Sequence, residues 1–151
     1  MSLVRLAAPR RPCLEILGPA GAPGLARPLL ACPVPAGFPS AADDHLDRKL
    51  DLNEYLVAHP EATFYLRVAG DSMRGAGIHA GDLLVVDRAV EPVDGHVVVA
   101  MVDGELTVKR LVFRRGRLAL SPENPAYKVI ELDPEAGVDV WGVVTHVIHK
   151  V

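Results

Sequence analysis

The sequence predicts a mostly β fold: a compact antiparallel β domain of about seven short strands, with one short helix and an extended N-terminal arm. Short apolar runs separated by Gly and Asp turn signals fill the chain from residue 62 onward, which is typical of antiparallel strands. Hydrophobic residues make up 50% of the 151 residues and aromatic residues only 5%, so aliphatic side chains must form the core. Prolines and glycines interrupt residues 1–41 too often for a helix of useful length.

The expected elements follow the arm in order. Asp51-Leu52-Asn53-Glu54 has the form of a capping box and Pro60 ends the segment, which predicts a short helix over about residues 51–58. Asp103-Gly104 is a hairpin signal between two apolar runs, and Arg115-Gly116 marks the next turn. The expected strands are 62–68, 83–86, 96–102, 105–113, 117–120, 128–132 and 138–148. We therefore divide the chain into an arm, residues 1–41, and a β-rich domain, residues 42–151.

Charge and composition exclude several classes of protein. The net charge is −3, which gives no attraction to nucleic acid, and the arm lacks the helices of a helix-turn-helix module. We therefore expect no sequence-specific DNA binding. No apolar stretch approaches the roughly 20 residues that span a membrane. Cys13 and Cys32 form neither a disulfide framework nor a CxxC zinc motif, and free thiols fit the reducing cytoplasm.

Ser72 and Lys109 are the candidate catalytic residues. Ser72 follows a predicted strand in the turn Gly70-Asp71-Ser72-Met73, where glycine permits a sharp bend that presents the hydroxyl. A serine hydroxyl needs a base, and lysine can act as that base only when it is neutral. Lys109 lies within a predicted strand with Thr107 on the same face, and Thr107 could orient the amine. Burial of that face would lower the lysine pKa from about 10.4 towards neutrality.

The same turn supplies a candidate oxyanion hole. The backbone N–H groups of Ser72 and Asp71 are the donors nearest to the hydroxyl. Met73 is expected either to pack beneath the site or to line a substrate pocket.

Other interpretations of these residues remain open. The tetrapeptide could be a simple turn, and the lysine could lie on a solvated edge. A Ser-His-Asp triad is possible in principle, although no spacing favours one; its base would come from His45, His59, His79, His96, His146 or His149. Asp82 and Asp87 are expected to cap turns, and His146 and His149 fit a strand surface better than a metal site. We therefore expect no metal and no cofactor.

Several motifs follow one another along the chain: Gly70-Asp71-Ser72-Met73, Gly77-Ile78, the run from Gly81 to Asp87, the run from Asp103 to Leu111, Asn124-Pro125-Ala126-Tyr127, and Val140-Trp141-Gly142-Val143-Val144. In this order they resemble the LexA/UmuD family of self-cleaving serine peptidases. Three further segments are more similar to the UmuD members: Gly37-Phe38-Pro39-Ser40, Asp51-Leu52-Asn53 and His59-Pro60. The resemblance covers roughly residues 34–150.

The resemblance implies that Ser72 is the nucleophile, Lys109 the general base and Ala36-Gly37 the scissile bond. Intramolecular acyl transfer would then release residues 1–36. It also implies a cytoplasmic homodimer whose cleavage is stimulated by a RecA–single-stranded DNA filament in the SOS response. The trimmed chain would become the accessory subunit of a UmuC-like Y-family polymerase in error-prone synthesis past DNA lesions.

Two alternative functions fit the same β domain. A non-catalytic polymerase-accessory or dimerisation module would keep the fold without the chemistry. A LexA-type transcriptional repressor peptidase would need a DNA-binding domain, for which the arm offers no helices.

Overall fold

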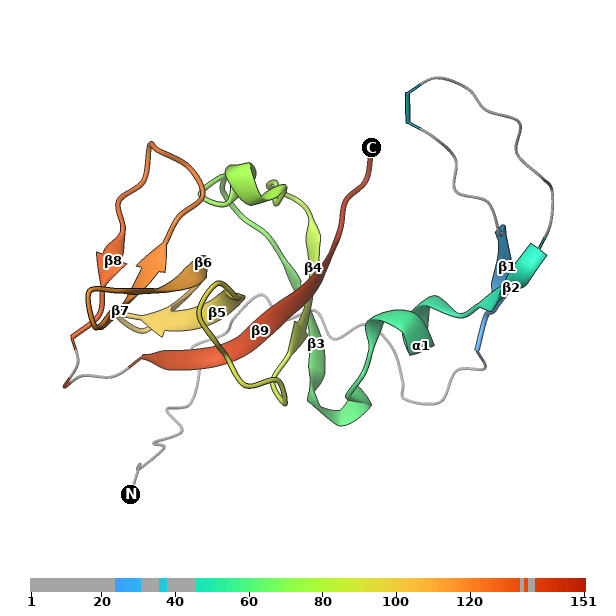
Figure 1. The fold of residues 1–151 in the computed structure, drawn as a ribbon, viewed down its shortest axis with the longest axis horizontal. Coiled ribbons are helices and arrows are strands. Elements are labelled where there is room, and N and C mark those ends of the chain that lie inside the picture. Colours follow the sequence, from blue (N-terminus) through green and yellow to red (C-terminus); the bar gives the residue numbers. More distant parts are fainter. Residues whose placement is uncertain (1–23, 31–35, 38–45, 134, 136–137) are drawn as a thin grey trace.

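A seven-stranded antiparallel sheet forms the body of the protein (Figure 1). The computed structural model describes residues 24–30, 36–37, 46–133, 135 and 138–151. The strand order is β3-β4-β9-β5-β6-β7-β8, and every neighbouring pair is antiparallel. The strands are β3 (Thr63–Arg67), β4 (Leu83–Asp87), β5 (Val97–Val102), β6 (Glu105–Arg114), β7 (Arg117–Ser121), β8 (Ile130–Glu131) and β9 (Asp139–Ile148). Each lies within or overlaps one expected run, so the predicted fold class is confirmed.

The remaining elements are small. The helix α1 (Leu52–Leu56) is shorter than expected, and Asp51 caps it by accepting a hydrogen bond from the Asn53 N–H at 2.8 Å. Two 3₁₀ turns follow, η1 (Pro60–Ala62) and η2 (Arg74–Ala76). The sequence did not predict the antiparallel ribbon of β1 (Arg27–Leu30) and β2 (Leu46–Leu50), which lies apart from the main sheet (Figure 1). The predicted boundary between residues 41 and 42, and both cysteines, lie outside the described residues.

The strand β5 is buried on both of its faces. Val99 packs in a cluster with Met73 and Leu84. Its neighbours Val98 and Ala100 point the other way and join a second cluster, which includes Leu111, Leu120 and Val143. Apolar side chains therefore cover both sides of the sheet at β5, which explains why its sequence is a continuous apolar run rather than an alternating one.

The long strand β9 joins two parts of the sheet (Figure 1). Its first half pairs with β5 and its second half pairs with β4, and each ladder contains a register shift. Gly142 lies in this region, where a Cβ would come within 2.7 Å of Val86 Cγ1. The absence of a side chain at Gly142 therefore permits the close packing of β9 on β4.

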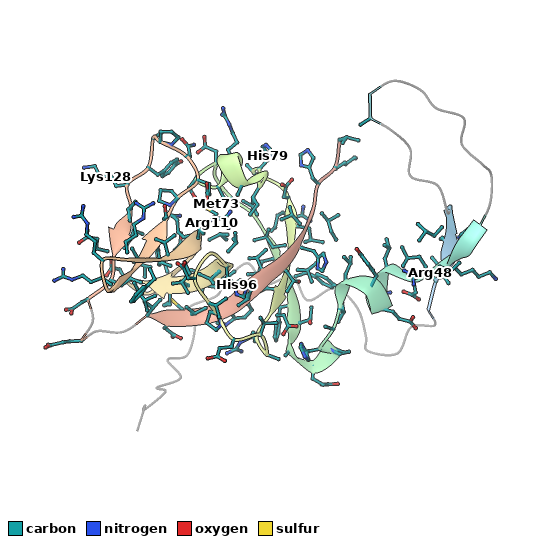
Figure 2. All side chains as sticks on the ribbon, in the orientation of Figure 1. Arg48, Met73, His79, His96, Arg110 and Lys128 are labelled. Atoms are coloured by element: carbon teal, nitrogen blue, oxygen red, sulfur yellow. The ribbon has the colours of Figure 1, made fainter. Side chains whose placement is uncertain are left out.

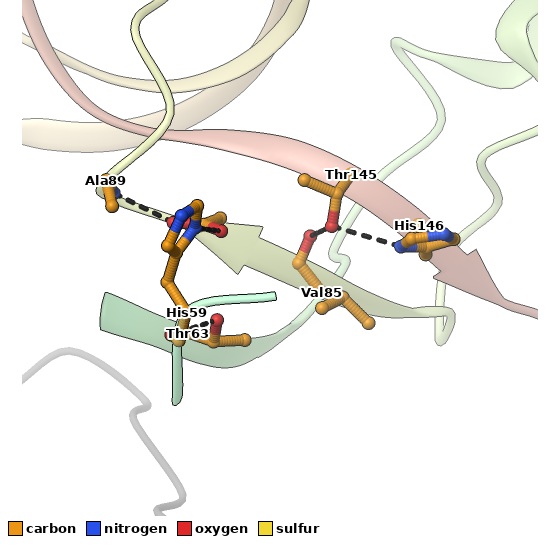
Figure 3. A network of polar contacts seen from close by, with 7 residues as sticks. His59, Thr63, Val85, Ala89, Thr145 and His146 are labelled. Atoms are coloured by element: carbon orange, nitrogen blue, oxygen red, sulfur yellow. Dashed lines mark hydrogen bonds and ion pairs between the residues drawn. The ribbon is translucent and has the colours of Figure 1, made fainter. Parts of the chain in front are cut away.

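A polar network secures the end of β4 (Figure 3). The Asp87 carboxylate lies 2.6 Å from His59 Nδ1 and accepts a hydrogen bond from the Ala89 N–H at 2.8 Å. Burial alone would raise the pKa of Asp87, but these hydrogen bonds outweigh it and hold the pKa below its usual value. Asp87 therefore caps a turn, as the sequence predicts.

Candidate active site

The fold brings Ser72 and Lys109 together. Ser72 lies on the turn between β3 and η2, and Lys109 lies in the middle of β6. Lysine Nζ is 3.0 Å from serine Oγ, which is hydrogen-bond distance, although the residues are 37 positions apart in the sequence. A neutral amine at this position could take the hydroxyl proton directly.

Lys109 is buried, and none of its hydrogen-bond partners among the described residues carries a negative charge. Only 8% of the residue is exposed, and its partner in the adjacent strand is the fully buried Val98. Besides Ser72, Nζ contacts the Thr107 hydroxyl at 2.8 Å and the Val108 carbonyl at 3.1 Å, so every oxygen that it contacts is neutral. Burial consequently lowers the pKa of Lys109 below its usual value of 10.5. The inward orientation and the contact with Thr107 agree with the sequence-based expectation.

A sharp turn of the backbone positions the Ser72 side chain. Gly70 has a φ of 85°, in the left-handed region that favours glycine. Met73 is 2% exposed and packs in the core beneath the turn (Figure 2), which settles one of the two roles expected for it. Within the described residues the backbone N–H groups of Asp71 and Ser72 donate no hydrogen bond to the protein. Among these residues, both N–H groups are therefore left without an acceptor.

The segment after β7 holds the serine turn, a contact that sequence reasoning missed. The Glu123 N–H donates to the Ser72 carbonyl at 2.8 Å, and the Gly75 N–H donates to the Glu123 carbonyl at 2.7 Å. Asn124 Nδ2 donates to the Asp71 carbonyl at 2.9 Å. Locally, Ser121 to Tyr127 signals only a turn, so nothing in the sequence indicates which other segment it contacts.

Two side chains strengthen this contact. The Tyr127 hydroxyl donates to Asp71 Oδ1 at 2.6 Å, and this hydrogen bond to a carboxylate raises the pKa of Tyr127. Arg110, the neighbour of Lys109 on β6, forms an ion pair with Glu123 (Figure 2). The strand that carries the lysine and the turn that carries the serine are therefore attached to the same segment.

Ala36 and Gly37 lie apart from this pair. They are exposed, and they belong to the connection between β1 and β2, well away from the sheet (Figure 1). No heavy atom lies within 4 Å of the position that a Gly37 Cβ would take. Cleavage at this bond would require the arm to move to Ser72.

The described histidines form pairs elsewhere. His59 contacts Asp87, and His149 contacts Asp82 at 2.6 Å. None of the histidines in the described ranges is hydrogen-bonded to Ser72, and His45 lies outside those ranges. The geometry thus offers Lys109, not histidine, as the base for Ser72.

Among the described residues, the side chains that could hold a metal ion are His79, Asp82 and His149, a cluster that the sequence did not predict.

The sequence is similar to known peptidases and to several named proteins. Residues 28–145 match the family described as Peptidase S24-like. The chain is 50% identical to Protein ImpA of Salmonella typhimurium over 132 residues, which are 87% of this chain and 90% of that protein. It is 48% identical to Protein MucA of Escherichia coli over 114 residues, 75% of this chain and 77% of that protein. It is 38% identical to the LexA repressor of Paracidovorax citrulli (strain AAC00-1) over 117 residues, 78% of this chain and 52% of the repressor.

Within the described residues, no helix is both long and apolar enough to span a membrane.

The family match covers the serine turn, β6 and the segment after β7, and the long alignments include the LexA repressor as well as shorter relatives. The chain therefore belongs to the S24-like peptidases and is a UmuD-like member of the LexA/UmuD family.

Proposed function

We propose that the chain is a serine peptidase that cuts its own arm between Ala36 and Gly37, with Ser72 as nucleophile and Lys109 as general base. The observation that carries the proposal is the 3.0 Å separation between Ser72 Oγ and the Nζ of a lysine that is 8% exposed. Burial favours the neutral amine, and Ser72 is within its reach.

The reaction begins with transfer of the Ser72 proton to neutral Lys109. Ser72 Oγ attacks the carbonyl carbon of Ala36, and the N–H groups of Asp71 and Ser72 stabilise the oxyanion. The C–N bond then breaks as Lys109 returns the proton to the Gly37 nitrogen. Water, activated by the same amine, hydrolyses the acyl-enzyme and releases residues 1–36.

In this scheme the rate of self-cleavage depends on how often the arm docks at Ser72. Ala36 and Gly37 lie apart from Ser72, so the observed rate is the product of the docked fraction and the chemical rate constant. A partner that binds only the docked conformer accelerates cleavage by shifting this population. We assign that role to a RecA–single-stranded DNA filament, on the basis of the family resemblance.

Mass spectrometry of the purified chain tests self-cleavage. At alkaline pH, where more Lys109 is neutral, we expect faster appearance of a product that begins at Gly37. Ser72→Ala and Lys109→Ala should abolish it, whereas the matched control Lys128→Ala should cleave normally. An intact mass at pH 7 and at pH 10, with and without a RecA filament, would refute self-cleavage and leave a non-catalytic module. Cleavage at the normal rate in either dyad variant would refute the assignment of the dyad.

The family resemblance also supports a cellular role. We propose that the trimmed chain is a cytoplasmic homodimer that serves a UmuC-like Y-family polymerase in SOS mutagenesis, without binding a specific DNA sequence itself. The test compares the intact Ser72→Ala chain with the fragment 37–151 in binding to such a polymerase. Equal affinity of the two forms would contradict a role for cleavage in this partnership.

A further inference from the structure

Three metal-ligating side chains gather at the base of the segment that carries Ser72. His79 lies on the turn after η2 (Figure 2), Asp82 immediately precedes β4, and His149 directly follows β9. One ligand atom from each lies within 4.8 Å of the other two. The cluster is separate from the Ser72–Lys109 pair and has no part in the proposed peptidase reaction.

The carboxylate is the centre of the cluster. Asp82 is 4% exposed, and its Oδ1 lies 2.6 Å from His149 Nδ1. Its Oδ2 accepts a hydrogen bond from the backbone N–H of His79 at 2.8 Å and lies 3.7 Å from His79 Nδ1. The two imidazole rings are inclined at 46°, with centroids 5.1 Å apart. The Nδ1 atoms of His79 and His149 therefore both face the Asp82 carboxylate.

His79 provides an independent indication of a ligand. Its Nδ1 is buried although 45% of the side chain is exposed, and among the described residues this nitrogen has no hydrogen-bond partner. The distance of 3.7 Å between His79 Nδ1 and Asp82 Oδ2 is too long for a hydrogen bond. Buried polar atoms in proteins almost always have a partner, so an unpaired imidazole nitrogen beside a carboxylate requires an explanation.

We propose that His79, Asp82 and His149 form a binding site for a divalent transition-metal ion, with Zn²⁺ the best fit. Two imidazole nitrogens and one carboxylate oxygen are a common set of zinc ligands, with bonds of about 2.0–2.2 Å. A tetrahedral site with such bonds separates its ligand atoms by about 3.3 Å. The present 3.7 Å between His79 Nδ1 and Asp82 Oδ2 is close to this value. His149 Nδ1 lies 2.6 Å from the other carboxylate oxygen, Asp82 Oδ1, so the metal must replace this hydrogen bond, which the place of His149 just beyond the end of β9 permits.

Metal binding would fasten the base of the serine segment to the end of β9. The Val68 N–H donates to the Asp82 carbonyl at 2.9 Å, and the Gly81 N–H donates to the Val68 carbonyl at 2.9 Å. These two hydrogen bonds close the base of residues 68–82, the segment that contains Ser72. Coordination by Asp82 and His149 would reinforce the connection of this base to β9, where Leu83 already pairs with Ile148, so the ion would have a structural role.

Calorimetric titration with Zn²⁺ and the visible absorption of bound Co²⁺ test the site. The full-length chain carries Ser72→Ala to prevent self-cleavage and Cys13→Ser with Cys32→Ser to remove thiol ligands. We expect one ion per chain, a tetrahedral Co²⁺ spectrum and a higher melting temperature with Zn²⁺. His79→Ala or His149→Ala should weaken binding about tenfold or more. His146→Ala, which changes a histidine on β9 outside the cluster, should bind like the parent.

Several outcomes would overturn the site. No binding of Zn²⁺ and no Co²⁺ spectrum would do so, as would equal affinities in the parent, His79→Ala and His149→Ala. His149 follows the last strand of the sheet and is exposed, so His149→Ala decides the question if His79→Ala does not fold. Loss of self-cleavage in the wild-type background would not affect this conclusion, because the readouts are binding and melting temperature.

Discussion

Replacing Lys109 with Met tests the burial of the amine separately from any peptidase activity. Met retains an unbranched apolar side chain on β6 and removes the ionisable group. Lys109 is 8% exposed, and burial lowers its pKa below the usual 10.5. The protonated amine is therefore less favourable in the folded chain than in the unfolded chain, whereas Met carries no such cost.

The sign and the size of the effect follow from proton linkage. Between the lowered folded-state pKa and 10.5, the unfolded chain binds more protons at Lys109 than the folded chain does. The free energy of unfolding of the lysine protein therefore rises with pH in this window, by up to about 1.4 kcal/mol per pH unit. The stability of the Met protein relative to the lysine protein should fall by the same amount.

Urea unfolding between pH 7 and pH 10.5 measures this difference. Both proteins carry Ser72→Ala, so that neither cuts itself during the experiment. Groups common to both proteins titrate equally and cancel in the difference. Lys128→Met, at an exposed position, is the matched control. A difference for Lys109→Met that does not change with pH would refute the argument that burial lowers the pKa of this amine.

Three glycine or aromatic substitutions test the supports of the site and the sheet. Gly75→Ala would bring a Cβ within 2.5 Å of the Glu123 carbonyl oxygen, so self-cleavage should slow about tenfold or more; an unchanged rate by mass spectrometry would show that the contact is dispensable. Tyr127→Phe removes the donor to Asp71 and should slow cleavage severalfold while the urea midpoint stays constant; equal rates would contradict a positioning role. Gly142→Ala forces a methyl group against a buried valine of β4 and should lower the free energy of unfolding by about 1–3 kcal/mol, and an unchanged urea midpoint would exclude this packing argument.

The main sheet was predictable because its signals are local. Asp103 and Gly104 have φ values of 50° and 82°, as the Asp-Gly hairpin signal requires, and the runs on either side form β5 and β6. The ribbon of β1 and β2 was not predictable in this way. Leu46–Leu50 is mostly charged and lacks apolar alternation, and β1 contains Pro28, which argues against a strand. The two segments pair with each other as antiparallel strands, a contact that neither segment signals by itself.

The candidate site likewise combines features that are local in the sequence with contacts between distant segments. Local features, the glycine turn and the inward strand position, made Ser72 and Lys109 separate candidates, and the resemblance to the LexA/UmuD family supplied their pairing. The support from Glu123 and Asn124 depends on contacts between distant segments, and no periodicity encodes such contacts. His79 and His149 likewise meet only because β9 pairs with β4.

The position of β9 in the sheet also determines when the pair can form during synthesis of the chain. The ribosome makes β3 and β4 with the serine turn first, then β5 to β8 with the lysine, and β9 last of these strands. Within the described residues, β9 provides the only backbone ladder between β4 and β5. A stalled nascent chain that ends before Asp139 should therefore stay uncut, which mass spectrometry of arrested chains would check. In the proposed reaction, the order of the strands would therefore delay self-cleavage until β9 has been made.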